Sequence, residues 1–347
     1  MTNAIGSDFA GHINVRLLTL AGQVSAVKID STRPRGVAKV FAGRTPEETV
    51  GLLGRVFSLC AMAQTVAGLE ALEDACGVNV AAPHRAARDI LREAEMLTQT
   101  LLRVCMDWPR VLDMPPAVEV ARAALSAQAG LEADLFDGQN WKVIGGVAMS
   151  PDEDALRTRL CDLQDVVAKT FDPGGLAETL VAALDRRGLN GFGALGEGVA
   201  PESGALSRHW NDADVAAARI AFGAGLRARL LARFADMRSL PVSLLNAVGE
   251  LHPCSGREFN PNANGAGTAT VETARGALTH TVSVKDGKIS TYVIDAPTDL
   301  NFLNDGVVAT GLLGAAAVDP DALNAAAELH VLAVDPCVRC TLEVRNA

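Results

Sequence analysis

The sequence predicts an α+β fold in which a central helical bundle is accompanied by small β elements near both ends of the chain. Two regions, 12–42 and 268–347, contain short segments where apolar and polar residues alternate, which is the period of a strand with one buried face. The region between them, 45–238, is rich in Ala and Leu at helical spacing. Because the strands near the two ends can meet, we expect residues 1–347 to form a single domain.

The N-terminal β region is expected to be a hairpin with a third, returning strand. INVRLL and QVSAVKI alternate on either side of a turn at Gly22. VAKVF follows Arg35-Gly36 and is expected to form the third strand, which returns along the hairpin.

A helix is expected to begin at Thr45-Pro46-Glu47-Glu48, because threonine caps helices, proline suits the first position and glutamate can close a capping box. Later positions of this helix repeat at helical spacing and include Val50, Leu53, Phe57 and Cys60. This spacing predicts that Cys60 lies on the buried face.

The rest of the helical region carries a second start signal, Ser150-Pro151-Asp152-Glu153. A further helix is expected over 214–237, ending before Pro241. Glycine-rich segments at 188–205 and 254–268 are expected to be loops.

The second β region predicts three short strands, TATVET, ALTHTVSV and KISTYVI. Lys285-Asp286-Gly287-Lys288 between the last two is a strong hairpin turn. A helical stretch starting at Asp321 leads to the final segment, HVLAVDPCVRC.

Composition excludes several classes of protein. The 347 residues carry 31 Lys and Arg against 41 Asp and Glu, a net charge of -10, and aromatic residues make up 4%. Neither the charge nor the aromatic content suits nucleic-acid binding. No basic segment followed by an apolar one marks a secretory signal, and no apolar run is long enough to cross a membrane. We therefore expect a cytoplasmic protein.

Cys337-Val338-Arg339-Cys340 is the clearest candidate for chemistry. Two thiols at this spacing can chelate a metal, but a zinc site needs two more ligands and no second pair of this kind exists. A thioredoxin-like pair should open a helix, for which the residues after Cys340 are too few. Taken alone, the motif is also compatible with two buried structural cysteines. The 7 cysteines are too few and too scattered for a secreted disulfide scaffold, and four of them match no motif and are assigned to packing: Cys76, Cys105, Cys161 and Cys254.

The final segment resembles the DPCxxC motif of [NiFe]-hydrogenase large subunits, and further matches follow in the same order along the chain. The matching segments are GHINVRL, Arg35-Gly36, AGRTPEE, RVFSLC at 55–60, Ile144-Gly145-Gly146-Val147 and ETARGALTHTVSVKDGKISTYVIDAPTDLN. The resemblance covers most of the chain and implies a [NiFe]-hydrogenase large-subunit-like fold.

Departures from that family concern nickel and protons. The resemblance implies four cysteines on nickel, of which the second in each pair also binds an iron that carries cyanide and carbon monoxide. Phe57 stands at one nickel-only position and its ring cannot ligate a metal, so we expect no stable nickel site. Gln64 and Glu343 replace two histidines of the family, and Ala10 and Ala38 replace two glutamates, Ala10 at the proton-passing position.

The iron ligands and their surroundings are retained. The resemblance implies Cys60 and Cys340 as protein ligands of iron, with Cys337 beside them. It also implies that four residues surround the diatomic ligands and orient the site: Arg275, Pro297, Thr298 and Asp335. His12 and His280 are expected to be structural.

This combination is similar to the HupK/HoxV group of hydrogenase accessory proteins. The resemblance implies a non-catalytic scaffold that carries the Fe(CN)2CO unit before its delivery to the true large subunit, and no removable C-terminal extension. The partners it implies are the large-subunit precursor, a small HypC-type chaperone and, as a further candidate, the HypD-type iron-assembly protein. Two alternatives remain at this point, a divergent hydrogenase-like redox subunit and a metal-free interaction protein of hydrogenase maturation.

Overall fold

A strand from each end of the chain joins one three-stranded sheet. The computed structural model describes residues 11–33, 36–195 and 202–346. In the sheet order β2-β1-β6, β1 (His12–Leu20) pairs antiparallel with β2 (Gln23–Ser31) and parallel with β6 (Arg339–Asn346). Ile13 lies opposite Cys340 in this register, so the C-terminal cysteine pair is fixed beside the N-terminal strand. The prediction that the two ends meet is confirmed.

The second sheet is a three-stranded antiparallel meander. It consists of β3 (Gly265–Thr273), β4 (Gly276–Lys285) and β5 (Lys288–Asp295). Asp286 and Gly287 in the connecting turn have φ angles of 51° and 70°, the left-handed pair that a tight hairpin requires. Strand β3 begins inside the segment that was expected to be a loop up to residue 268. A Cβ at Gly267 would lie 2.3 Å from the carbonyl oxygen of Ala71, so glycine here permits close approach to α2 (Ala61–Ala75) rather than marking a loop.

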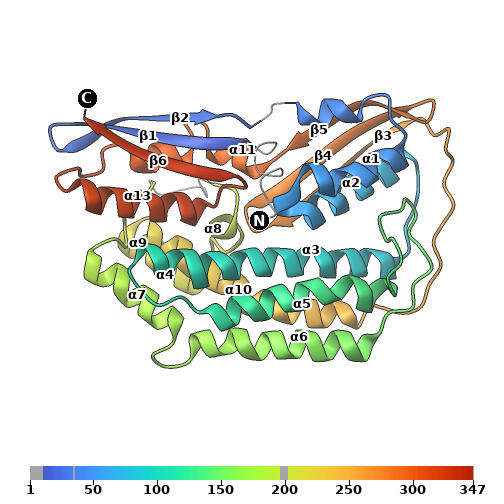
Figure 1. The fold of residues 1–347 in the computed structure, drawn as a ribbon, viewed down its shortest axis with the longest axis horizontal. Coiled ribbons are helices and arrows are strands. Elements are labelled where there is room, and N and C mark those ends of the chain that lie inside the picture. The colour runs from blue at the N-terminus through green and yellow to red at the C-terminus, as the bar shows by residue number, and fades with distance from the viewer. Residues whose placement is uncertain (1–10, 34–35, 196–201, 347) are drawn as a thin grey trace, which may run out of the picture.

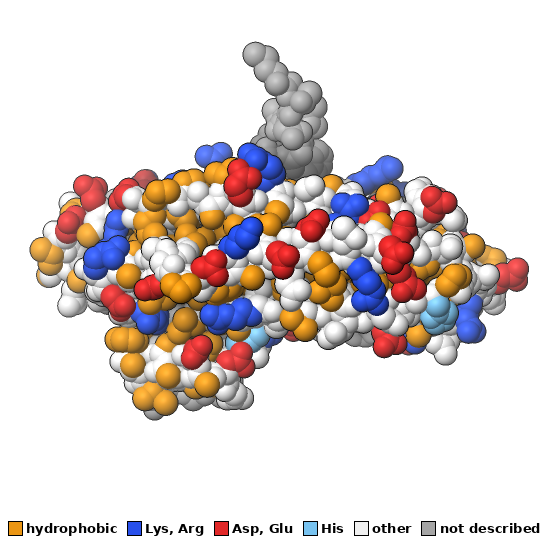
Figure 2. All heavy atoms as spheres, turned by 90° about the horizontal axis from the view of Figure 1, so that it is seen from below, with side chains coloured by type: hydrophobic (Ala, Val, Ile, Leu, Met, Phe, Trp, Pro, Cys, Tyr) orange, Lys and Arg blue, Asp and Glu red, His pale blue; other side chains and the backbone are white. Residues whose placement is uncertain are grey.

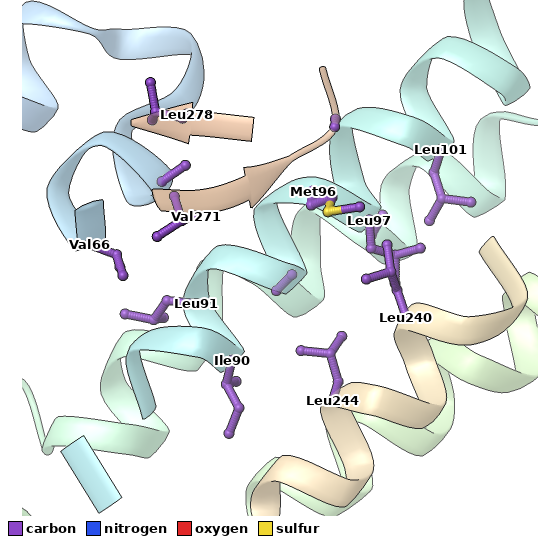
Figure 3. Close-up of a cluster of buried hydrophobic side chains, with 14 of the residues drawn as sticks. Val66, Ile90, Leu91, Met96, Leu97, Leu101, Leu240, Leu244, Val271 and Leu278 are labelled. Carbon is purple, nitrogen blue, oxygen red and sulfur yellow. The ribbon is translucent and has the colours of Figure 1, made fainter. Parts of the chain in front are cut away.

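The sheets lie along one side of a helical layer (Figure 1), with α3 (Ala82–Leu102) at its centre. Leu97 of α3 lies beside Leu240 of α10 (Leu226–Val248), while Val66 of α2 and Val271 of β3 pack against the preceding turns of α3 (Figure 3). These side chains are fully or almost fully buried, and each contributes roughly 1.5–3 kcal/mol by leaving water. The remaining helices are α1 (Pro46–Val56), α4 (Trp108–Val111), α5 (Val118–Phe136), α6 (Glu153–Ala168), α7 (Leu176–Arg187), α8 (Ala205–Arg208), α9 (Ala213–Phe222), α10 (Leu226–Val248), α11 (Pro297–Asn301), α12 (Val307–Leu312) and α13 (Pro320–Val334).

The helix start predicted at Thr45 is confirmed in its hydrogen bonds, whereas α6 begins two residues later than the Ser150-Pro151 signal indicates, with Asp152 as its cap. The side chain of Thr45 accepts from the backbone N–H of Glu48 at 3.3 Å, and the Glu48 carboxylate accepts from the backbone N–H of Thr45 at 3.0 Å. At α6, Asp152 accepts from the backbone N–H of Ala155 at 3.0 Å. Both caps satisfy amide groups that the first turn of a helix leaves unpaired.

Several local predictions are wrong. VAKVF forms the 3-10 helix η1 (Val37–Phe41) instead of a strand, because the buried Phe41 ring packs against Tyr292 with ring centroids 4.9 Å apart. The helix expected over 214–237 is two helices, α9 and α10, broken where a Cβ at Gly225 would meet the Asn190 carbonyl oxygen at 2.7 Å.

Two helix boundaries also differ. Helix α10 continues through Pro241, which is buried with Leu244 against the core, so packing outweighs the lost backbone hydrogen bond. Helix α13 is capped by Asp319 rather than started by Asp321.

The described part of the chain contains no helix that is both long and apolar enough to cross a membrane. Basic and acidic side chains are interspersed on the face seen from below in Figure 2, so this face offers no surface of one sign for a nucleic-acid backbone. Ala10 and Arg35, both used in the sequence comparison, lie outside the described residues.

Candidate functional site

Cys60 lies at the start of α2, not in the helix that precedes it. Helix α1 ends at Val56, and the short 3-10 helix η2 (Ser58–Cys60) leads to α2, so the prediction that Cys60 continues the buried face of α1 is wrong. Burial raises the pKa of the Cys60 thiol to about 12, and the nearby thiol of Cys337 and carboxylate of Glu95 act in the same direction. The metal-free Cys60 is therefore a neutral thiol, and metal binding must displace its proton.

The C-terminal pair follows α13. The backbone N–H of Cys337 donates to Oγ1 of the buried Thr298 at 3.3 Å, which ties the cysteine segment to the start of α11. Cys340 lies on β6, and burial raises the pKa of its thiol to about 12 although Arg103 acts against this shift. The structure thus brings Cys337 close to Cys60, but no group of three His, Cys, Asp or Glu side chains within the described ranges is arranged to hold a metal ion.

Asp335 is the charged centre of the site. Its side chain is fully buried, and its φ angle of 63° turns the backbone from α13 into the cysteine segment. Arg103 Nε donates to Oδ1 at 2.6 Å, and Nη2 atoms of Arg275 and Arg233 lie 3.6 Å and 3.8 Å from the two carboxylate oxygens. Burial alone would raise the pKa of Asp335, but Arg275, Arg103 and Arg233 outweigh it and lower the pKa below its usual value.

Three side chains spaced four residues apart organise this site, Glu95 and Gln99 in α3 and Arg103 directly after its last residue, and none of them was predicted from the sequence. Glu95 accepts from the backbone N–H groups of Met62 and Ala63, at 3.0 Å and 3.1 Å, and so caps α2 beside Cys60. Gln99 accepts from Arg275 Nη1 at 2.5 Å and donates to the carbonyl oxygen of Leu59, the residue before Cys60. Arg103 holds Asp335. The signal in the sequence was the polar i, i+4, i+8 spacing of Glu95, Gln99 and Arg103 within a mostly buried helix.

A chain of buried hydrogen bonds ends at the Cys60 sulfur. His280 Nε2 lies 3.0 Å from Gln64 Oε1 and can only donate there, so Nδ1 accepts from the Tyr292 hydroxyl at 2.8 Å. Gln64 Nε2 in turn donates to Cys60 Sγ at 3.8 Å. Burial lowers the pKa of His280 to about 3, which keeps the ring neutral. The expectation that His280 is structural is consistent with this arrangement.

The residues present fit an iron unit with anionic ligands. Arg103, Arg233 and Arg275 surround the carboxylate of Asp335, and Arg103 also pairs with Asp107. Arg275 Nε, together with Nε and Nη1 of Arg233, is buried without a hydrogen-bond partner in the described part of the chain. Such donors suit cyanide, and thiols suit iron that carries strong-field ligands. Pro297 and Thr298, both buried at the start of α11, complete the predicted surroundings.

Similar proteins were found over nearly the whole chain, although no family model matches it. The "Hydrogenase expression/formation protein HupK" of Azotobacter vinelandii is 31% identical over 366 residues, covering 97% of this chain and 100% of that protein. The protein of the same name from Rhizobium leguminosarum bv. viciae is 29% identical over 97% of this chain and 98% of its own. The "Hydrogenase expression/formation protein HoxV" of Cupriavidus necator is 27% identical over 94% and 95%, respectively.

Solved structures share the fold. The reduced Ni-Fe-Se hydrogenase from D. vulgaris Hildenborough superimposes with a TM-score of 0.75 over 92% of this chain and 95% of that chain, at 18% identity. The reduced, active enzyme from Desulfomicrobium baculatum gives a TM-score of 0.73 at 17% identity, with coverage of 92% and 95%. These matches confirm the predicted hydrogenase large-subunit-like α+β fold.

Proposed function

The chain belongs to the HupK/HoxV family of hydrogenase expression/formation proteins, and on this premise we propose that it is a non-catalytic carrier for the Fe(CN)2CO unit during assembly of a [NiFe]-hydrogenase large subunit. The observation that carries the proposal is the pairing of thiols with free arginine donors. Cys337 and the cation of Arg275 both lie near Cys60, and the buried Nε of Arg275 has no partner within the described residues. Thiolates would bind the iron, and Arg275 would meet its cyanide ligands.

Phe57 supports a carrier rather than an enzyme. It is half-buried at the end of α1, packs against the core and cannot ligate a metal. The thiol that would help to hold nickel in the catalytic family is therefore missing, so bound iron would not be locked by a second metal. We propose transient complexes in the cytoplasm with the large-subunit precursor and with the small HypC-type chaperone that delivers iron, and a HypD-type iron-assembly protein is a further candidate partner.

The test is to isolate the chain without oxygen from a host that contains the hydrogenase maturation machinery. We expect bound iron, little nickel, and infrared bands of cyanide and carbon monoxide. Arg275→Gln should shift the cyanide bands, because it removes the cation nearest to them, whereas Arg122→Gln, on an exposed surface, should leave them in place. Stoichiometric nickel without diatomic bands would refute the carrier.

A metal-free interaction protein is the second candidate. It is favoured by the lack of any three-donor metal group among the residues that the structure describes. If it is correct, Cys60→Ala and Cys340→Ala should still support hydrogenase maturation in a strain that lacks the native gene. Hydrogen-dependent dye reduction by the purified chain would instead indicate a divergent redox subunit.

A further inference from the structure

The side chains proposed to surround the diatomic ligands belong to two separate elements. Arg275 lies in the turn between β3 and β4, whereas Pro297 and Thr298 begin α11. Both elements can meet the ligands of one iron unit only if the position of the turn relative to α11 is fixed. The segment from Ser203 to Arg208 forms hydrogen bonds with both of them.

Ser203 is bound to α11 at two points. Its backbone N–H donates to Oδ1 of Asn301 at 3.2 Å, and Nδ2 of Asn301 donates to the carbonyl oxygen of Ser203 at 2.9 Å. Asn301 is buried and is the last residue of α11. Because its side-chain amide accepts at one atom and donates at the other, only one orientation of this amide satisfies both bonds. The backbone of Ser203 therefore keeps a fixed position relative to α11.

The side chain of Ser203 contacts the turn that carries Arg275. Its Oγ accepts from the backbone N–H of Ala277 at 3.0 Å. A Cβ at Gly276, where φ is 123°, would collide with this oxygen, and a Cβ at Gly204 would lie 3.3 Å from the carbonyl oxygen of Arg275. The two glycines let the backbones approach so closely that one serine binds both elements.

Arg208, the last residue of α8, holds another part of the same turn. Its Nη1 donates to the carbonyl oxygen of Thr273 at 3.0 Å and to the carboxylate of Glu272 at 2.7 Å. Oγ1 of Thr273 accepts from the backbone N–H of Arg275 at 3.1 Å and donates to the carbonyl oxygen of Gly276 at 2.8 Å. Arg208 therefore fixes the residue that shapes the backbone around Arg275.

Helix α10 anchors Arg208 from the other side. The buried carboxylate of Asp236 accepts from Nη2 of Arg208 at 2.8 Å and from Nε at 3.2 Å. Burial alone would raise the pKa of Asp236, but His209 and Arg208 outweigh it and lower the pKa, so the anchor stays charged. One turn earlier on the same helix, Nη2 of Arg233 lies 3.8 Å from Oδ2 of Asp335. Helix α10 thus contacts both Arg208 and the charged centre of the iron site.

We propose that Ser203 and Arg208 are positioning residues of the iron site, which hold the Arg275 turn and α11 in one arrangement so that both meet the ligands of the same iron unit. The inference rests on the proposed carrier function. Both side chains use their hydrogen bonds on groups of the protein, so they act through Arg275 and not on the cargo itself.

The first experiment measures the cyanide infrared bands of the iron-loaded full chain. Ser203→Ala removes the acceptor of the Ala277 amide and keeps both backbone bonds to Asn301. It should broaden the bands, because Arg275 is then held less firmly. Ser290→Ala is the matched control, since it removes an exposed hydroxyl that donates to a carbonyl oxygen of the same sheet, and it should leave the bands unchanged.

Arg208→Lys tests the second positioning residue. Lysine keeps a positive charge beside Asp236 but lacks the planar fork that donates to Asp236 and Thr273 together. The cyanide bands should broaden as they do in Ser203→Ala. Unchanged bands in either variant overturn the assignment of that residue.

A double variant separates positioning from a general loss of structure. In the Arg275→Gln background, Ser203→Ala should cause no further change in the cyanide bands, since the cation through which Ser203 acts is absent. A serine that supports the fold without positioning Arg275 would change the bands equally in both backgrounds, and this result overturns the proposal.

The second experiment needs no iron and therefore separates a failure of this inference from a failure of the carrier function. In the metal-free chain, NMR follows hydrogen exchange at the Ala277 amide. Asn301→Ala should speed this exchange about tenfold, because it loosens Ser203, the partner of that amide. Asn304→Ala should leave the rate unchanged, because Asn304 accepts from the backbone N–H of Ile29 in β2 instead.

Equal exchange rates at Ala277 in the wild type and in Asn301→Ala would show that Ser203 does not couple α11 to the turn, and the proposal would be wrong whether or not the chain carries iron. Faster exchange in Asn301→Ala supports the coupling even if the wild type shows no diatomic bands, a result that refutes the carrier function alone.

Discussion

Arg103 donates from Nε to Oδ1 of Asp335 at 2.6 Å and thereby joins the C-terminal end of the central helix α3 to the residue two positions before Cys337. The two residues are 232 positions apart in the sequence. Through this bond and those of Gln99 and Glu95, one helix contacts both cysteine-bearing segments. The relative placement of Cys60 and Cys337 therefore depends on α3.

Asp335→Asn should destabilise the fold strongly. The substitution removes the ion-pair partner that the buried Arg233 and Arg275 share, and losing one partner of a buried ion pair typically costs about 3–5 kcal/mol. Urea unfolding measures this loss. Glu119→Gln is the control, because it removes an exposed ion pair with Arg122 that is worth at most about 1 kcal/mol.

The acid sensitivity of this contribution follows from the lowered pKa of Asp335. It should be fully present above the unfolded-state pKa near 3.9 and be lost as pH falls through the still lower folded-state value. Equal unfolding free energies for Asp335→Asn and Glu119→Gln at neutral pH would show that the arginine cluster does not need its carboxylate.

His280 should make the fold sensitive to mild acid. Burial lowers its folded-state pKa to about 3, whereas the unfolded value is about 6.5. Between these values the unfolded chain binds a proton that the folded chain does not, so the free energy of unfolding should fall by about 1.4 kcal/mol per pH unit on account of this residue.

Denaturant unfolding at several pH values below about 6.5 tests this prediction. His280→Gln should reduce the slope of the unfolding free energy against pH by the contribution of one proton. His252→Gln, at an exposed position, should leave the slope unchanged. An unaltered slope in His280→Gln would mean that the ring is protonated in the folded state or that the site opens to water.

The fold could be predicted from the sequence more fully than the arrangement of side chains around the proposed site. Alternating strands, the Asp286-Gly287 turn and the Thr45 capping box are local signals, and each was confirmed. The VAKVF segment, Pro241 and Gly225 were misinterpreted because packing against distant residues decided their conformation. Family motifs supplied the cysteines and Arg275.

Motifs could not reveal what holds these residues in place. Glu95, Gln99 and Arg103 carry no recognisable motif, and their function depends on partners that α2, the turn between β3 and β4, and the end of α13 bring to them only in the folded chain. A period-four polar stripe in a buried helix is the one local signal, and it predicts a polar face without saying what the face contacts.

The cysteines should differ in their effect on iron loading. Cys60→Ala or Cys340→Ala should abolish loading, since each removes one proposed protein ligand. Cys337→Ala should reduce it less if this thiol only assists transfer. Cys76→Ala and Cys105→Ala should load as the wild type does. Iron content after anaerobic purification measures the order, and equal content in all five variants would refute the site.

The last prediction concerns release of the iron unit. A carrier must bind its cargo less completely than the final site does, and Phe57 is the residue that most limits binding here. It lies at the end of α1, just before the η2 segment that carries Cys60. Phe57→Cys would return a fourth thiol to the site, whereas Phe57→Ala opens the same space without a ligand.

We expect iron-loaded wild type and Phe57→Ala to pass their cyanide and carbon monoxide bands to an apo large-subunit precursor when the small chaperone is present. Phe57→Cys should retain the bands about tenfold longer and bind nickel, because a fourth thiolate completes a soft-ligand set that can hold a second metal. Infrared spectra of the two proteins after separation measure the transfer. Release from Phe57→Cys as fast as from Phe57→Ala would show that the missing thiol is not what keeps the cargo exchangeable. If the bands never leave the wild-type chain, the carrier function is wrong and storage of iron becomes the better account.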